Sequence, residues 1–284
     1  DTKSNENKQV NIHITANQEN QMSTRKNVKD YIDSMSLSPD GKRVMVGARG
    51  DLFSVPAKNG EIKNITQTPA SREMNVTYSP DGKRIAYLSD ASGEYEIYLR
   101  NSKTLKETQL TDDGSVWRFA PVWSPDSKKL AYSDKDHKLW TVNAETGKRT
   151  LADQSDMNDI QDYSWSPDSS WLVYTKGELN GFSSMYIHNL KKAQSTLLSD
   201  KEHSDFSPVF GANGDYLFFL SNRDYNLTFS SFEFNHVYNN ATQVYAAQLN
   251  HASPELFPYS EDGQVNTKSE AGGDKDDSDD KEKS

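Results

Sequence analysis

Residues 123–142 read WSPDSKKLAYSDKDHKLWTV, and this stretch predicts the local fold. Pro125 fixes φ at the first turn position, and the side chain of Asp126 caps the turn. The segment that follows, Lys129–Ser133, is short, apolar and bounded by polar residues, as expected for a strand covered on both faces. The largely apolar stretch Leu139–Val142 supplies the next strand. The stretch therefore predicts a strand, a tight turn and two more strands.

The same pattern recurs along the chain. The other copies are LSPDGKRVMVGARGDLFSVP from Leu37, YSPDGKRIAYLSDASGEYEIYL from Tyr78, WSPDSSWLVYTKGELNGFSSMYI from Trp165 and a degenerate FGANGDYLFFLSNRD from Phe210. Aligned on Ser38, Ser79, Ser124, Ser166 and Gly211, the copies are spaced by 41, 45, 42 and 45 residues. This period is close to that of a four-stranded propeller blade. Stretches such as TGKRT and NGEIKNIT lead into a fourth strand, so the sequence predicts an all-β chain, a β-propeller of four-stranded blades with about five blades visible.

Residues that recur at one repeat position have a structural explanation. A blade exposes apolar faces that only its neighbours can cover, so large side chains at equivalent positions are expected to pack between blades instead of forming a ligand cage. The aromatic members of this set are Trp123, Trp165, Tyr87, Tyr132 and Tyr174. The recurrent acidic residues, interpreted as turn residues, are Asp40, Asp81, Asp126 and Asp168.

The two ends lack the repeat. Residues 1–27 are polar, although QVNIHITA alternates apolar residues in a way that suits one strand. Residues 28–258 carry the blades. Residues 259–284 form an acidic linker, in which residues 270–284 hold seven acidic and three basic residues. Such a run buries too little apolar surface to offset its ordering entropy and is expected to be disordered, and it lacks the glycine position of a calcium loop.

Composition excludes several classes of partner. The formal net charge of −10 argues against nucleic acid, whose phosphates need clustered Lys and Arg. Cysteine is absent, which excludes disulfides and thiolate metal sites and leaves both cytoplasm and periplasm open. No apolar run is long enough to cross a bilayer, so we expect no membrane partner. Because the chain begins at Asp1 instead of Met, we expect it to be part of a longer protein.

The sequence carries none of the motifs we would expect of a catalytic or cofactor site. G-x-S-x-G, H-E-x-x-H, the phosphate-binding Walker loop and G-x-G-x-x-G are all absent. His203, Ser204 and Asp205 are consecutive, and neighbours on an extended segment point to opposite faces, so they are not expected to form a catalytic triad. The histidines are scattered without metal-type spacing, at His13, His137, His188, His203, His236 and His251. We therefore predict no catalytic, cofactor-binding or metal-binding residues in this chain.

One segment interrupts the repeats. After Ser221–Asp224 comes YNLTFSSFEFNHVYNNAT, an aromatic-rich insertion of 18 residues. Long ordered loops usually carry function, so the insertion is interpreted either as a loop packed on its blade or as a contact surface for another domain. Both interpretations stay open at this point.

A family resemblance rests on these repeats and on longer stretches. The WSPDG-type repeats resemble those of TolB and of tricorn proteases. The further stretches ARGDLFSVPAKNG (48–60), SDASGEYEIYL (89–99) and SNRDYNLTFSSFEFNHVYNNATQVYA (221–246) make residues 28–250 look like the second, seven-bladed propeller of bacterial tricorn-like serine peptidases. The resemblance implies a multi-domain peptidase with two propellers, a PDZ-like domain and a separate catalytic core. The family's catalytic Ser, His and Glu match no position here.

The resemblance implies a function and leaves one alternative. The chain is expected to be a non-catalytic part of the peptidase that guides oligopeptides, with innermost strands such as residues 120–124 lining a channel. Its expected partners are oligopeptide substrates, the other domains of the parent and a second copy of the parent, and its expected compartment is the cytoplasm, with the periplasm as alternative. About five blades are present where seven are expected, and the acidic segment falls where further blades would follow. The alternative is a TolB-like propeller that serves as a protein–protein interaction module.

Overall fold

The computed structural model describes residues 27–224, 227–229, 236–238 and 240–257. Their regular structure is almost entirely β, after one turn of 3-10 helix, η2, at Lys29–Tyr31. Blade 1 contains β1 (Ile32–Leu37), β2 (Arg43–Ala48), β3 (Asp51–Pro56) and β4 (Lys63–Asn64); blade 2 contains β5 (Glu73–Tyr78), β6 (Arg84–Ser89), β7 (Glu96–Asn101) and β8 (Glu107–Gln109). Blade 3 contains β9 (Val122–Trp123), β10 (Lys129–Ser133), β11 (Lys138–Asn143) and β12 (Arg149–Gln154); blade 4 contains β13 (Tyr163–Trp165), β14 (Trp171–Gly177), β15 (Ser183–Asn189) and β16 (Gln194–Leu197).

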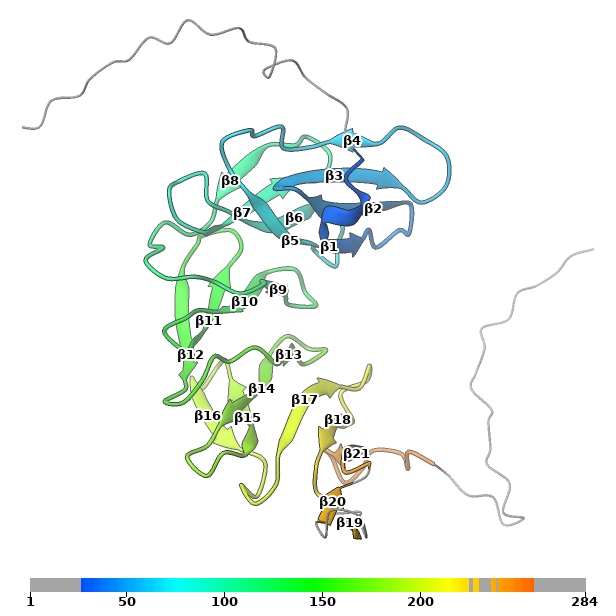
Figure 1. Cartoon of the computed structure of the whole chain (residues 1–284), viewed down its shortest axis with the longest axis vertical. Helices are drawn as coiled ribbons and strands as arrows, with labels where there is room; N and C mark the ends of the chain where they lie inside the picture. The colour runs from blue at the N-terminus through cyan, green and yellow to red at the C-terminus, as the bar shows by residue number, and fades with distance from the viewer. Residues whose placement is uncertain (1–26, 225–226, 230–235, 239, 258–284) are drawn as a thin grey trace, which may run out of the picture.

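These sheets are antiparallel meanders arranged in an arc. Within each of blades 1 to 4 the strands pair in chain order. Figure 1 shows the first strand of each blade on the concave side of the arc and the fourth on the convex side. The predicted all-β propeller architecture is confirmed.

Blade 5 differs from the others. In the described residues its sheet has three strands, β17 (Asp205–Phe210), β18 (Tyr216–Ser221) and β21 (Gln243–Gln248). The described part of the insertion forms a separate hairpin of β19 (Leu227–Phe229) and β20 (His236–Tyr238), in which Phe229 is exposed. The two described strands of the insertion thus pair with each other, and whether the insertion packs on its blade or contacts another domain stays a prediction.

The repeated turn forms as its residues predict. In blade 3 the Ser124 hydroxyl donates to Asp126 over 2.6 Å and accepts from the Lys129 amide at 2.9 Å, while the Asp126 carboxylate also accepts from the Lys128 amide at 3.0 Å. The fourth turn residue, Ser127, has φ of +61°. Glycine tolerates this left-handed conformation best, and Gly41, Gly82 and Gly214 occupy the equivalent position in blades 1, 2 and 5.

The recurrent aromatics lie between blades, as predicted. Tyr87, Tyr132 and Tyr174 are fully buried, and Trp123 and Trp165 are 6% exposed. Each indole also donates a hydrogen bond to the preceding blade, Trp123 Nε1 to the Thr77 carbonyl at 3.4 Å and Trp165 Nε1 to the Val122 carbonyl at 3.1 Å. The apolar core is therefore a series of seams between neighbouring sheets.

Two sequence predictions lie outside this description. The strand expected at QVNIHITA and the acidic linker at 259–284 both fall in residues that the structure does not describe. Both remain predictions.

Candidate functional site

At two of the four seams, the turn serine of one blade accepts a hydrogen bond from the turn of the preceding blade. The Asp81 amide of blade 2 donates to the Ser127 hydroxyl of blade 3 at 3.0 Å, and the Asp126 amide of blade 3 donates to the Ser169 hydroxyl of blade 4 at 3.1 Å. At the other two seams, glycine occupies the position of this turn serine, Gly82 between blades 1 and 2 and Gly214 between blades 4 and 5. This turn contact is therefore missing at these two seams, which serine hydroxyls bridge elsewhere: Ser34 and Ser36 accept hydrogen bonds from amides of blade 2, and Ser207 of blade 5 donates to Asp162.

Hollows lie at both of these glycine seams, and one of about 440 Å³ lies between blades 2 and 3, where Ser127 bridges the turns. Between blades 1 and 2 a cavity of about 390 Å³ is lined by the turn of blade 1, Tyr78 and Gly82. Between blades 4 and 5 a cavity of about 430 Å³ opens between the turns of the two blades. Its lining residues are Ser166, Pro167, Asp168, Trp171, Ile187, Phe210, Asn213, Gly214 and Leu249. We call this cavity between blades 4 and 5 the 4–5 hollow.

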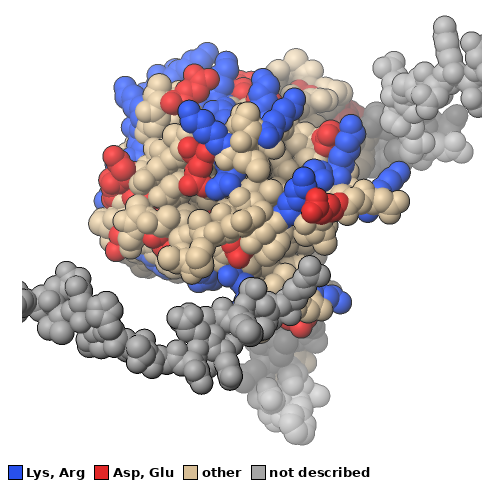
Figure 2. All heavy atoms as spheres, turned by 90° about the horizontal axis from the view of Figure 1, so that it is seen from above, with Lys and Arg blue, Asp and Glu red and all other residues tan. Residues whose placement is uncertain are grey.

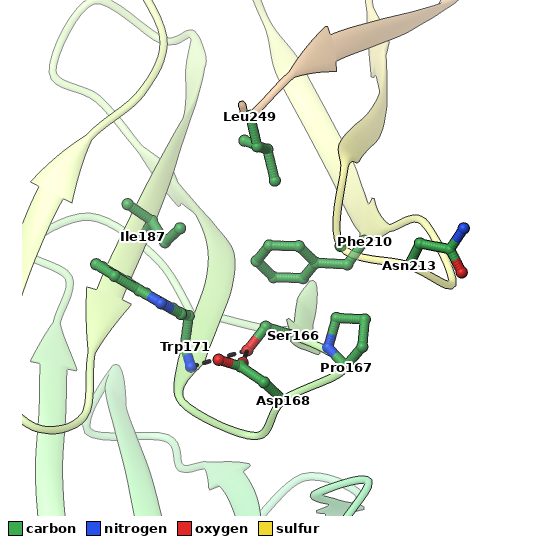
Figure 3. A pocket seen from close by; sticks show the side chains of 9 residues that line it. Ser166, Pro167, Asp168, Trp171, Ile187, Phe210, Asn213 and Leu249 are labelled. Carbon is green, nitrogen blue, oxygen red and sulfur yellow. Dashed lines mark hydrogen bonds between the residues drawn. The ribbon is translucent and has the colours of Figure 1, made fainter. Parts of the chain in front are cut away.

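The 4–5 hollow combines aromatic walls with a charged rim. Figure 3 shows the Phe210 ring pointing toward the blade 4 side chains, with Trp171 and Ile187 opposite it and Leu249 on another side. Asp168 lies at the turn of blade 4, where the Ser166 hydroxyl donates to it over 2.5 Å. Hydrogen bonds from Ser166 and Ser170 hold the pKa of Asp168 below its ordinary value, so this carboxylate is charged at neutral pH. The hollow therefore suits a ligand that is flat, partly apolar and cationic.

The first strands of the blades lie on the concave side of the arc (Figure 1). Residues 120–124 include β9, and the exposed side chain of Val122 lies here. The carbonyl oxygens of Ala120 and Val122 accept hydrogen bonds from Tyr163 and Trp165 of blade 4, at 2.7 and 3.1 Å. These two carbonyl oxygens are therefore engaged across the seam.

The consecutive His203, Ser204 and Asp205 each contact a different residue. His203 Nδ1 lies 3.2 Å from a carboxylate oxygen of Asp200. The Ser204 hydroxyl accepts a hydrogen bond from the Ser183 amide at 3.3 Å, and Asp205, fully buried, binds Arg223 with both oxygens at 2.8 Å. The prediction that the chain carries no catalytic residue stays a prediction.

The remaining histidines lie in separate surroundings where they are described. His188 is buried, with Nδ1 3.0 Å from the Ser195 hydroxyl, and burial lowers its pKa. His251 is exposed. Across the described ranges, no group of three or more His, Cys, Asp or Glu side chains is placed to hold a metal ion.

A cluster of buried charged side chains lies between blades 2 and 3 and was not predicted from the sequence. Arg118 and Glu96 form an ion pair in which both side chains are 3% exposed, and Arg118 also binds Asp113 at 2.8 Å. The Thr111 hydroxyl donates to Glu96 and the Gly114 amide does so as well. Nothing in the repeat pattern predicts this cluster, because Arg118 lies in the irregular segment between blades 2 and 3.

The surface charge is mixed on the side that Figure 2 shows, where Lys and Arg alternate with Asp and Glu. Surface ion pairs such as Lys83 with Asp81, 3.5 Å apart, also bring the two signs together. None of the helical structure among the described residues is long and apolar enough to cross a membrane.

Comparison with known proteins identifies the family. The sequence family described as the tricorn protease second beta propeller domain matches residues 32–283. Tricorn protease homolog 1 of Streptomyces coelicolor is 26% identical over 237 residues, which cover 78% of this chain and 22% of that protein. The Tol-Pal system protein TolB of Francisella tularensis is 25% identical over 191 residues, covering 64% of this chain and 42% of that protein.

A solved structure shows the same fold. The crystal structure of the tricorn protease superimposes with a TM-score of 0.71 at 17% identity, over 82% of this chain and 24% of that one. The chain thus spans roughly a quarter or less of the tricorn proteins that it matches. Since the family match extends over most of the sequence, the chain belongs to the family of the tricorn protease second β-propeller domain.

Proposed function

We propose that this propeller is a non-catalytic part of a longer tricorn-like serine peptidase and guides oligopeptides toward a catalytic core outside the chain. The observation that carries the proposal is the family match over residues 32–283, in a chain that spans only 22% of its Streptomyces relative. The separate contacts of His203, Ser204 and Asp205 support a scaffold function.

The concave side of the arc is the surface that such guidance would use. The first strands lie there (Figure 1), and they carry exposed apolar side chains at Leu37, Val122 and Val209. Apolar side chains bind an extended peptide weakly and with little sequence preference, which suits passage more than retention.

The proposal is tested by narrowing this side in the full-length parent protein. We expect Val122→Trp to lower kcat/KM for a peptide of about ten residues severalfold, because the indole obstructs the path, and to leave cleavage of a short chromogenic substrate unchanged. The matched control is Leu151→Trp, on the outer strand β12, where the native side chain is comparably exposed. Equal effects of the two substitutions on the long peptide would contradict guidance along the concave side.

The second candidate is a protein–protein interaction module, which the similarity to TolB favours. The gene downstream of Ser284 separates the two. Further blades and a PDZ-like domain would support the peptidase, whereas a stop codon or an unrelated domain would support the interaction module.

The expected partners and compartment follow from the same proposal. The propeller would contact the other domains of its parent and, through the parent, a second copy, and the parent would be located in the cytoplasm, with the periplasm as alternative. Size-exclusion chromatography of the parent tests its assembly, and cell fractionation tests its location.

A further inference from the structure

The seam between blades 2 and 3 contains a guanidinium site built from the chain's own residues. Arg84 at the start of β6 reaches into blade 3, where its Nη1 donates to the Ala144 carbonyl at 3.0 Å and its Nη2 donates to the Ser127 carbonyl at 2.5 Å. Its guanidinium carbon lies 5.1 Å from the centre of the Trp123 ring. An aromatic face and two carbonyl acceptors are the groups that a guanidinium needs when it leaves water. We call this arrangement the Arg84 seat.

The 4–5 hollow is the counterpart of that seat without its arginine. In the repeat alignment Trp171 takes the position of Arg84, Phe210 that of Trp123 and Gly214 that of Ser127. Leu249 corresponds to Ala144, because the amide of each donates to the carbonyl of the equivalent turn residue of its own blade, Asp215 and Lys128. All four of these residues of blades 4 and 5 line the hollow, and Figure 3 shows the Phe210 and Leu249 side chains beside it. The residues equivalent to the walls of the Arg84 seat therefore line the 4–5 hollow, and Trp171 stands at the position of the arginine.

The charge around the hollow favours a cation from elsewhere. The Asp168 carboxylate lies on its rim, within a chain whose net charge is −10. An aromatic wall attracts a cation through the negative face of its ring, and a nearby carboxylate adds to this attraction.

The hollow between blades 1 and 2 is less suited to a cation. Its lining includes Arg43, which is in the position equivalent to Arg84 and turns back to donate to the Ser54 hydroxyl at 2.6 Å. The positive charge of this side chain would repel a second guanidinium. The two hollows therefore differ in the ligand that they accept.

We propose that the 4–5 hollow binds an arginine side chain of a partner polypeptide, in the way that the seam between blades 2 and 3 binds Arg84. Arginine fits better than lysine because a planar guanidinium can stack on Phe210 while it donates to two carbonyls at once. The site lies at the turns of the blades, so it does not depend on peptide guidance along the concave side.

The direct test is titration of the 284-residue chain with a capped Gly-Arg-Gly peptide and with its citrulline analogue, followed by NMR. Citrulline keeps the shape of arginine and lacks the charge. We expect the arginine peptide to bind at least tenfold more tightly and to shift the indole signal of Trp171. Equal binding of the two peptides, or binding without a shift at Trp171, would overturn the proposal.

Substitutions place the binding in the hollow. Trp171→Arg gives the hollow a guanidinium of its own, as at the Arg84 seat, and should weaken peptide binding at least tenfold, whereas Trp171→Leu, which adds no cation, should weaken it less. Asp168→Asn should weaken binding about fivefold, because the amide keeps the turn's acceptor oxygen and loses the charge. The matched control is Asp126→Asn, which makes the same change at a turn whose seam is bridged by Ser169.

Two results with these variants would overturn the proposal. Unchanged binding by a folded Trp171→Arg chain would overturn the proposal. Should that chain fail to fold by circular dichroism, the pair Asp168→Asn and Asp126→Asn decides, since equal affinities for the arginine peptide in these two variants would also overturn it.

Discussion

The hydroxyl of Ser127 holds two blades together at a strained backbone position, and substitutions there separate the two effects. The hydroxyl accepts the Asp81 amide at 3.0 Å, and Ser127 itself has φ of +61°. A hydrogen bond of this kind contributes about 1 kcal/mol to stability, and a non-glycine residue in the left-handed region costs about 1 kcal/mol. In the native chain the contact offsets the strain.

Two substitutions therefore have different consequences. Ser127→Ala keeps the strain and loses the hydrogen bond, so the free energy of unfolding should fall by about 1 kcal/mol. Ser127→Gly loses the hydrogen bond and relieves the strain, so the free energy of unfolding should change by less than about 0.5 kcal/mol. Gly82 offers the reverse experiment, because a Cβ there would meet Pro39 at 3.5 Å, an ordinary contact. We expect Gly82→Ala to cost about 1 kcal/mol and Gly82→Ser to recover most of that loss.

Urea unfolding of the four variants measures these free energies, and amide hydrogen exchange localises them. The Asp81 amide should exchange about fivefold faster in both Ser127 variants, because the lost hydrogen bond is worth about 1 kcal/mol and about 1.4 kcal/mol corresponds to a tenfold change. The Asp126 amide, held by Ser169, serves as the internal control and should keep its protection. If Ser127→Ala proved as stable as the native chain, with Asp81 still protected, the hydrogen bond would contribute nothing and the reasoning would be refuted.

Three further predictions concern buried polar groups. In urea unfolding, Arg118→Met should lower the free energy of unfolding by about 3–5 kcal/mol, because it leaves the Glu96 carboxylate buried without its partner. The double variant Glu96→Gln/Arg118→Met should recover much of that loss. Arg84→Met keeps the stem and removes two hydrogen bonds across the seam, so thermal unfolding should report a loss of about 2 kcal/mol; an unchanged melting temperature would contradict the Arg84 seat. Burial lowers the pKa of His188 below 6.5, so the unfolded state takes up the proton first as the pH falls. The free energy of unfolding should therefore decrease as the pH drops below 6.5 toward the folded pKa. Relative to His188→Gln, whose amide can still bond Ser195, the native chain should lose stability between pH 7 and pH 5; parallel curves of stability against pH for the two chains would contradict this.

Much of the fold can be predicted because the repeat is made of local interactions. The turn Ser124–Ser127 closes within four residues, and the strand that follows, Lys129–Ser133, is buried on both faces as its short apolar run predicts. Recurrence at equivalent positions then predicts that Tyr87, Tyr132 and Tyr174 meet a neighbouring blade, because each blade can cover its apolar faces only with its neighbours. The sequence repeat therefore predicts both the turn and the packing of the tyrosines between blades.

The candidate site could not be predicted in the same way, because it depends on departures from the repeat. Gly214 differs from the equivalent serines by one side chain, and the shape of the hollow beside it depends on how the Phe210 ring lies against blade 4. Likewise the position occupied by Arg43 and Arg84 is the same in the repeat, yet one side chain folds back on its own blade and the other crosses the seam.

The sequence by itself determined the all-β repeat, its turns and the aromatic faces between blades, because these follow from contacts within one repeat and from its recurrence. Only the tertiary structure decided which side chains reach across each seam, which residues line the hollows between blades and where buried charges such as Arg118 find their partners. The physical reason is distance along the chain. The Ser127 carbonyl and Arg84 are 43 residues apart, and a contact of that span depends on the packing of two whole sheets and on rotamers that no local pattern records.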